Sequence, residues 1–271
     1  MINTSKDQLR SHLKFDLDIQ ADDLIFLFSG MRDFGVFENG PTGILEVFQD
    51  LLREGTLVIP TFTYSWSNQE IFDLKVTPAP LMGLVANQSL TCEGFLRSSH
   101  PNFSVNIYSK DDETLKKIMP TSNDSFGSGS IFHNIYLHFP NAKILLLGGV
   151  FPDCSYRSTF IHTAQQIEGV WHRYLKKFND PKGVDADVTQ YVRFIDANEY
   201  EYVKKLRPPS DCSFPIMEDF KQYSKDLLDA GILRTRGFGY GQSRLVNVGP
   251  SIDLFREGLL QNKSYGLLNH A

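Results

Sequence analysis

Continuous apolar runs alternate with helical patterns along the first half of the chain. The apolar runs are "DLIFLFS" (Asp23–Ser29), "TLVIPTFT" (Thr56–Thr63) and "AKILLLGG" (Ala142–Gly149). Runs of this kind predict strands that are covered on both faces. The segment Pro41–Gly55 has helical spacing, with proline in the first turn and glycine at the usual position of a left-handed cap. The order strand, helix, strand predicts a layered α/β/α fold around a mixed sheet.

The pattern changes after Gly169. Apolar and polar residues alternate in "VTQYVRFI" (Val188–Ile195) and "RLVNV" (Arg244–Val248), and an amphipathic helix is predicted for Met217–Leu228. Alternation with period two is typical of antiparallel strands with one exposed face. We therefore expect two units, residues 1–170 as the α/β domain and residues 171–271 as a smaller, mostly antiparallel β lobe.

Composition narrows the class of protein and of ligand. The 271 residues are 41% hydrophobic and 22% charged, as in an ordinary soluble globular protein. A net charge of −5 without a concentrated basic face argues against nucleic acid as a partner. The three cysteines form no CxxC pair, so we expect neither a zinc site nor a disulfide framework, and no metal. No stretch has the length of a signal peptide core or a membrane span, which predicts a cytoplasmic protein that is not bound to membranes.

Four loops follow predicted strands or precede helices, where ligands of α/β proteins usually bind. They are "SGMRDFGVFENG" (Ser29–Gly40), "IPTFTYSW" (Ile59–Trp66), "RSSHPNFS" (Arg97–Ser104) and "DSFGSGSIF" (Asp124–Phe132). The first offers backbone amides near a helix start, although a plain surface loop fits the same pattern. The histidine of the third precedes a proline in an extended turn, where it is either structural or part of a site. The fourth lacks the lysine of a phosphate-binding loop.

Taken in order, these segments carry a resemblance to a known family. "EGTLVIPTFT", "RSSHPNFS", "SFGSGSIF", the "LLLGG" strand, "STFIH" and the closing "GFGYGQSRLVNVGPSIDLFREGLLQNKSYGLL" resemble the aminoglycoside 3-N-acetyltransferase family over most of the chain. The combination of "PTFTYSW", "HPNFS", "TFIH" and "RYLKKF" looks closer to a branch that acylates amino sugars for bacterial surface polysaccharides. The resemblance implies an N-acyltransferase of α/β fold that uses acyl-CoA, either acetyl-CoA or a 3-hydroxyacyl-CoA.

The reaction needs a base, because an alkyl ammonium cannot attack a thioester until it loses a proton. Histidine has a suitable pKa for this task. The resemblance implies that His162 is the base, since the family places its catalytic histidine in the T-x-x-H pattern, here Thr159–His162. Where the family commonly has a glutamate, this chain has Gln165. Glutamine can fix the imidazole tautomer but cannot stabilise the imidazolium by charge, so the orienting acid is open. Among Asp153, Glu93 and Glu168 we prefer Asp153, which follows the Ala142–Gly149 strand directly.

The resemblance also implies binding sites for the developing oxyanion and for CoA. Hydroxyl and amide groups around Thr61, Ser104 and Thr159 are expected to face the oxyanion. The segment Ser29–Gly35 is expected to bind CoA. Its contributing residues are Ser29, Gly30, Met31, Arg32 and Gly35, together with Thr61. Phe28 stands where the family often has a histidine, so one polar contact is missing.

Two rival hypotheses remain at this level. Cys154 precedes His162 closely enough to suggest an acyl-enzyme mechanism with ping-pong kinetics. The exchange of glutamate for Gln165 suggests a relative that binds sugars without catalysing a reaction. We favour direct attack in a ternary complex, because the motifs around His162 occur together.

The acceptor is predicted from basic and aromatic residues in the second lobe. "VWHRYLKKF" (Val170–Phe178) and "LRTRGFGYGQSR" (Leu233–Arg244) suit a diphosphate and a base, whereas a polycationic aminoglycoside requires carboxylates. We therefore expect a nucleotide-linked (dTDP or UDP) amino-deoxysugar, with an aminoglycoside as the alternative. The expected acceptor-binding residues are Tyr64, His100, Ser104, Trp171, Arg173, Tyr174, Arg236 and Arg244. Assembly as a homodimer is left open.

Overall fold

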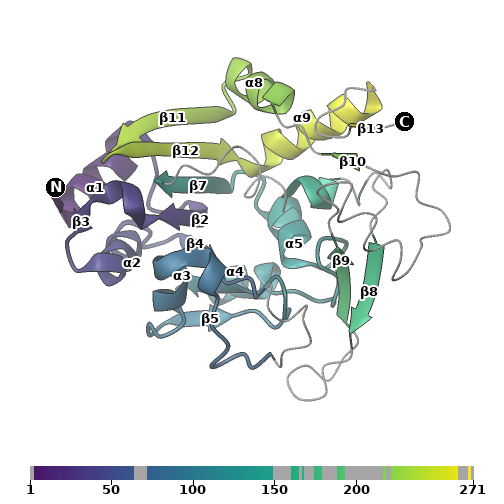
Figure 1. Ribbon diagram of the computed structural model, residues 1–271, viewed down its shortest axis with the longest axis horizontal. Coiled ribbons are helices and arrows are strands. Elements are labelled where there is room, and N and C mark those ends of the chain that lie inside the picture. The colour runs from purple at the N-terminus through teal and green to yellow at the C-terminus, as the bar shows by residue number, and fades with distance from the viewer. Residues whose placement is uncertain are drawn as a thin grey trace.

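The computed structural model describes residues 3–63, 72–148, 160–164, 167, 174–178, 188–192, 216–217, 221–261 and 268–269 (Figure 1). The N-terminal half contains β1 (Asn3–Thr4), α1 (Lys6–Ser11), the π-helix η1 (His12–Asp16), β2 (Leu24–Gly30), the 3₁₀ helix η2 (Met31–Phe34), β3 (Val36–Phe37), α2 (Gly40–Leu51), β4 (Thr56–Pro60), η4 (Pro80–Met82), α3 (Gly83–Ser89), β5 (Phe95–Arg97), β6 (Val105–Ser109), α4 (Asp112–Ile118) and α5 (Ile131–His138). The remainder contains β7 (Lys143–Gly148), a helical segment at 160–164, β8 (Tyr174–Phe178), β9 (Val188–Val192), β10 (Ile216–Met217), α8 (Lys221–Asp229), β11 (Leu233–Phe238), β12 (Gly241–Asn247), α9 (Val248–Leu260) and β13 (Leu268–Asn269).

A seven-stranded mixed sheet has the order β11-β12-β7-β2-β4-β6-β5. The three central strands β7, β2 and β4 are parallel to one another. Each strand outside these three is antiparallel to its neighbour in the sheet. Two shorter antiparallel pairs, β8 with β9 and β10 with β13, complete the C-terminal part. The predicted layered α/β fold with a mixed sheet is confirmed.

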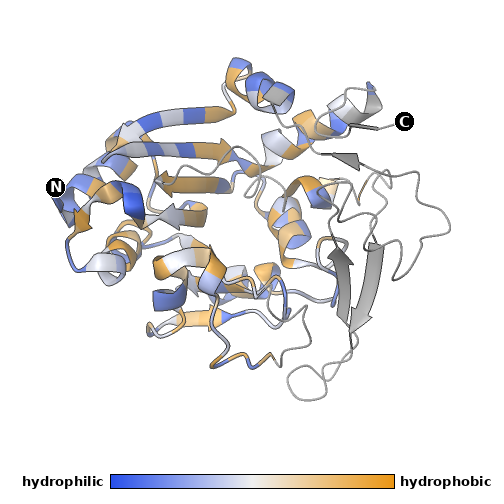
Figure 2. Ribbon diagram, viewed as in Figure 1, coloured by the Kyte–Doolittle hydropathy of each residue, from blue (hydrophilic) through white to orange (hydrophobic). Residues whose placement is uncertain are grey.

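Side chains of the central strands alternate between two hydrophobic cores, one on each face of the sheet. Phe26 and Leu146 belong to the first core, and their neighbours Leu27 and Leu147 belong to the second. Figure 2 shows β7 hydrophobic along most of its length, whereas polar bands interrupt β11 and β12. Continuous burial of both faces explains why the apolar runs in the sequence predicted these strands well.

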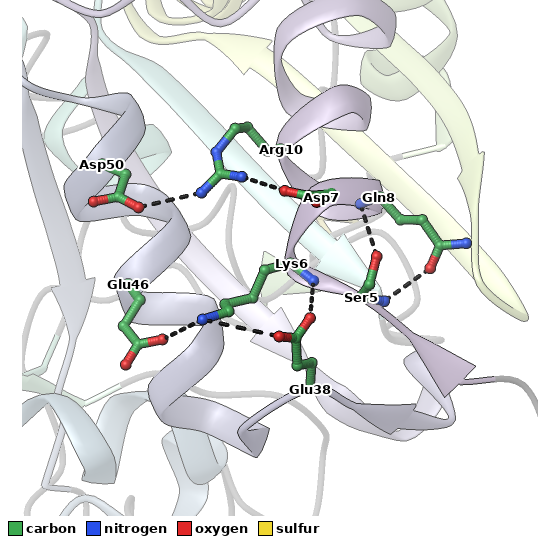
Figure 3. Close-up of polar contacts among 8 residues, drawn as sticks. All are labelled: Ser5, Lys6, Asp7, Gln8, Arg10, Glu38, Glu46 and Asp50. Atoms are coloured by element: carbon green, nitrogen blue, oxygen red, sulfur yellow. Dashed lines mark hydrogen bonds and ion pairs between the residues drawn. The ribbon is translucent and has the colours of Figure 1, made fainter.

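Helices cover both faces. The second core receives residues from α1, η1, α2 and α3, and the first from α4, α5, the 160–164 segment, α8 and α9. Ion pairs fasten α1 to α2, with Lys6 Nζ 3.1 Å from Glu46 and Arg10 Nη2 3.2 Å from Asp50 (Figure 3). Ser5 caps α1 in a reciprocal capping box with Gln8. No helix in the described part of the chain is long and apolar enough to cross a membrane.

Two local predictions need correction. The helix predicted for Pro41–Gly55 ends at Leu51, and Gly55 has no left-handed conformation. Glycine is needed there for space, because a Cβ would collide with the carbonyl oxygen of Asp23. The segment "RLVNV" was expected as a strand in a separate lobe, but its first four residues belong to β12, which pairs with β7 in the large sheet, and Val248 begins α9. The division at residue 170 itself lies outside the described residues.

Candidate active site

The carboxyl ends of the parallel strands meet at one edge of the sheet, where Gly30 of β2 pairs with Gly148 of β7. Ligands of open α/β sheets bind at this edge. The predicted site segments that leave it are the loop Ser29–Gly35 after β2 and the residues Thr61 and Thr63 after β4. The β5–β6 connection, which carries His100, meets β4 here, since Thr61 N donates to Ser104 O and Thr63 N to Asn102 O.

His162 lies in the helical segment 160–164, whose residues Phe160 and Ile161 anchor it in the first core. Its side chain is only 3% exposed. The ring meets Phe126 edge to face, with centroids 5.1 Å apart. The fold therefore holds the ring of His162 against an apolar surface.

Phe126 belongs to the Gly/Ser loop before α5, and the turn of that loop is built by Asp124. The Asp124 Oδ1 accepts from the backbone N–H groups of Phe126 (2.9 Å) and Gly127 (2.8 Å). Ser130 then caps α5 by accepting from His133 N. This loop was predicted to open a helix, and the structure adds that it positions the ring beside His162.

His100 is buried and structural in its contacts. Its Nδ1 accepts from the backbone N–H groups of Asn102 (3.3 Å) and Phe103 (3.1 Å), so the ring proton belongs on Nε2, which lies 3.2 Å from Ser125 Oγ. A ring nitrogen that already accepts two N–H groups is a poor proton acceptor. These two accepted hydrogen bonds argue against His100 as the base.

Arg97 is the last residue of β5 and contacts Thr61 and Ser104. No role was predicted for it from the sequence. Its guanidinium donates to the carbonyl oxygens of Thr61 (3.1 Å) and Thr77 (2.6 Å), its Nε donates to Ser104 Oγ (3.2 Å), and it stacks over Phe72. Burial lowers its pKa to about 10, and the nearby charge of Asp73 opposes this shift. A single arginine between Leu96 and Ser98 carries no periodic signal, so sequence patterns could not have identified it.

Thr61 and Ser104, expected to face the oxyanion, are both fully buried. Their hydroxyl oxygens lie 3.1 Å apart, and Ser104 Oγ donates to the Thr61 carbonyl oxygen over 2.8 Å. The structure thus brings the two residues into contact. Their hydroxyl groups join β4 to the β5–β6 loop in the structure, and a role at the oxyanion remains a prediction.

Contacts within the fold occupy part of the segment Ser29–Gly35, which was expected to bind CoA. Ser29 and Gly30 extend β2, and η2 packs on the β11–β12 hairpin, where Tyr240 N donates to Asp33 O over 2.7 Å. Gly35 has φ +69°, a conformation that favours glycine. Met31 is half-buried and Arg32 is exposed. The loop therefore presents a glycine-bearing turn and one exposed cation.

Arg236 and Arg244 do not form one patch. Arg236 pairs with Ser243 across β11 and β12, so these two residues share a face, and the adjacent Arg244 points to the other. Arg244 pairs with Leu146, which belongs to the core that contains Phe160. Arg244 is thus on the face of the sheet covered by the His162 segment.

The remaining predicted site residues lie outside the described residues: Tyr64, Asp153, Thr159, Gln165, Trp171 and Arg173, with the alternative nucleophile Cys154. Tyr174 begins β8, and its side chain is also outside the description. Within the described ranges no group of three or more His, Cys, Asp or Glu side chains could hold a metal ion.

A second polar cluster occupies the opposite face of the sheet. His12 Nδ1 lies 2.8 Å from Asp16 Oδ2, and His12 Nε2 lies 3.0 Å from Ser243 Oγ. The order resembles a catalytic triad, but Ser243 is completely buried on the face of the sheet opposite the one that the His162 segment covers. The cluster therefore joins η1 to β12 rather than forming a nucleophilic site.

Known structures share the fold described above. Aminoglycoside acetyltransferase AAC(3)-IVa as apoenzyme has a TM-score of 0.72 and 20% identity, covering 99% of this chain and 93% of its own. Its histidine-to-alanine mutant in complex with a gentamicin has a TM-score of 0.76 and 19% identity over the same shares. AAC-IIIb, binary with CoASH, has a TM-score of 0.71 and 18% identity, covering 96% and 98%. The fold is therefore that of these acetyltransferases.

The sequence profile of the aminoglycoside 3-N-acetyltransferase family matches residues 26–259. The chain belongs to the aminoglycoside 3-N-acetyltransferase family. No curated protein matches the chain in sequence. Membership confirms the predicted family and the predicted acyltransferase class, and acyl-CoA as co-substrate agrees with the CoA complex of AAC-IIIb.

The predicted acceptor was wrong. The family match and the gentamicin complex of a relative favour the aminoglycoside alternative over a nucleotide-linked amino sugar, and the polysaccharide branch is not supported. Arg236 and Arg244 were taken together as a site for a diphosphate. Since they point to opposite faces of the sheet, they cannot clamp one phosphate group together.

Proposed function

We propose that this protein transfers the acetyl group of acetyl-CoA to an amine of an aminoglycoside. The observation that carries the proposal is the family match over residues 26–259, which spans the strand edge and His162. A relative binds CoASH and another binds a gentamicin. Both ligands fit an acetyltransferase of this class.

His162 acts as the general base in this proposal. It removes a proton from the acceptor ammonium, and the free amine nitrogen then forms a bond to the acetyl carbon as the bond from that carbon to sulfur breaks. The protonated His162 returns its proton to the departing thiolate, and the acylated nitrogen loses its second proton to solvent, so the products are a neutral amide, the CoA thiol and one proton. Direct transfer of this kind requires no covalent acyl-enzyme.

The segment Ser29–Gly35 would hold the CoA portion. Arg32 is exposed and can pair with a phosphate group, and the turn at Gly35 lets the backbone approach a ligand closely. CoA supplies the activated thioester. The contribution of the chain is to bind this group beside His162 and to exclude water with the surrounding aromatic rings.

The test is an assay of thiol release from acetyl-CoA with gentamicin, sisomicin and apramycin as acceptors. We expect turnover with at least one of them, a product heavier by one acetyl group, and a modified 3-amino group in the NMR spectrum. Binding of acetyl-CoA without turnover of any aminoglycoside would refute the proposal and support a non-catalytic relative.

A further inference from the structure

Asn102 has a buried amide oxygen without a hydrogen-bond partner among the residues that the structure describes. The side chain is 1% exposed, and the atom concerned is Oδ1. Buried polar atoms in native proteins are nearly always paired, so an exception asks for a functional explanation. Other buried asparagines of the chain are bonded: Asn134 Nδ2 donates to Met119 O (3.0 Å) and Asn106 Nδ2 to Ser89 O (2.6 Å).

The backbone around Asn102 is fixed on both sides. Its N–H donates to His100 Nδ1, and its carbonyl oxygen accepts from Thr63 N over 3.0 Å. Thr63 Oγ1 also donates to the carbonyl oxygen of Pro101. Because these bonds hold the loop, Asn102 cannot reach a partner by a small shift of the chain.

Asn102 belongs to the candidate active site. The next residue, Phe103, contacts Phe126 with ring centroids 4.7 Å apart, and Phe126 contacts His162 at 5.1 Å. The expected CoA segment leaves β2 and packs on the β11–β12 hairpin. Asn102 instead lies in the loop between β5 and β6, and in the sheet these strands are on the far side of β4 from β2. Asn102 and the expected CoA segment therefore lie on opposite sides of β4.

We propose that Asn102 is a specificity-determining residue whose Oδ1 accepts a hydrogen bond from an ammonium or hydroxyl group of the aminoglycoside acceptor. This inference rests on the proposed function. An aminoglycoside carries many such donors, and an ammonium group has three donors and no acceptor. An amide oxygen that is not engaged by the surrounding chain binds such a donor without first breaking another bond.

The experiment compares Asn102→Leu and Asn102→Asp with the wild-type protein. Leucine keeps the approximate shape of asparagine and removes the acceptor. We expect Asn102→Leu to raise KM for the aminoglycoside about tenfold or more, since a hydrogen bond to a charged group is lost. The KM for acetyl-CoA and kcat should stay near wild type, and Tm should not fall, because no internal bond is broken. Asn102→Asp keeps an acceptor and should hold KM at or below the wild-type value.

Asn134→Leu is the matched control. Asn134 is also buried but donates to two carbonyl groups, so its replacement should lower Tm and leave KM unchanged. A fall in Tm for Asn102→Leu with an unchanged aminoglycoside KM would overturn the inference while the proposed function stands. An unchanged KM and an unchanged Tm would overturn it too, since a bound water would then be the partner. Inactivity of the wild-type protein toward every aminoglycoside would instead refute the proposed function and, with it, this inference.

Discussion

The guanidinium of Arg97 donates a hydrogen bond to the main-chain oxygen of Thr61, 3.1 Å away. The same group reaches Ser104 and Thr77, so one buried cation joins the end of β4, the β5–β6 loop and the segment after residue 72. In the part of the chain that the structure describes, carbonyl oxygens and a hydroxyl group receive its hydrogen bonds. The shape of the site on the β4 side therefore depends on this side chain.

Replacing Arg97 should destabilise the protein. Arg97→Met breaks hydrogen bonds from a charged group to four partners, the carbonyl oxygens of residues 61, 74 and 77 and the Oγ of Ser104, and we expect a loss of about 2–3 kcal/mol in the free energy of unfolding. Arg97→Lys should recover only part of this loss, because an ammonium cannot reproduce the planar fork of donors. Urea denaturation measures both values. Arg236→Met is the control, because Arg236 is exposed and donates its hydrogen bond to the carbonyl oxygen of the adjacent Thr235. Equal losses of unfolding free energy at the two positions would contradict the structural role of Arg97.

Replacing His162 should abolish most of the activity. We expect His162→Asn to lower kcat by about a hundredfold or more and to leave acetyl-CoA affinity nearly unchanged, because only the proton transfer is removed. Steady-state kinetics and calorimetric titration with acetyl-CoA measure the two effects.

His100→Gln provides the comparison for that variant. Because Nδ1 of His100 accepts two backbone N–H groups, this change should lower Tm and leave kcat within a few fold of wild type at a temperature where the protein stays folded. A large loss of kcat in His100→Gln, with His162→Asn still active, would reverse the assignment of the base.

The His12–Ser243 contact should contribute to stability without affecting catalysis. We expect Ser243→Ala to cost about 1 kcal/mol of unfolding free energy, as for a typical buried hydrogen bond, with unchanged kcat. A double-mutant cycle with Asp16→Ala tests whether the three side chains act together. Purely additive effects would show that the serine and the carboxylate act independently, and a lost activity would imply that the cluster has a chemical role.

Stability should fall in mild acid because of His133. Burial, and then the charge of His138, lower the pKa of His133 below its usual 6.5. The unfolded chain therefore binds the proton more readily, so this contribution is fully present above about pH 6.5 and is lost as the pH falls through the lowered pKa. Thermal melts between about pH 7 and about pH 5 should show a smaller decline of Tm for His133→Leu than for the wild-type protein. An identical decline would assign the acid sensitivity to other groups.

Several parts of the fold were determined by the sequence alone. The central strands β2, β4 and β7 are buried on both faces, and such strands leave a continuous apolar run that can be recognised locally. The helix α2 was recognised from its 3.6-residue spacing, but its end was misplaced by four residues. Gly55 is required by the close approach of the Asp23 carbonyl oxygen and does not cap the helix. The family resemblance also came from the order of short motifs.

Only the tertiary structure decided which polar groups have partners. The sequence does not distinguish the histidines of "HPNFS" and "STFIH", but the fold directs two backbone donors at Nδ1 of His100 and packs the ring of His162 edge to face on Phe126. Arg97 and Asn102 became visible only through contacts with residues distant in sequence. Arg236 and Arg244 were grouped by their closeness along the chain, and the register of β11 on β12 separated them onto opposite faces. Local sequence patterns indicate burial and backbone conformation. Hydrogen-bond partners depend on how segments distant in the sequence align with one another, and a local pattern does not show this alignment.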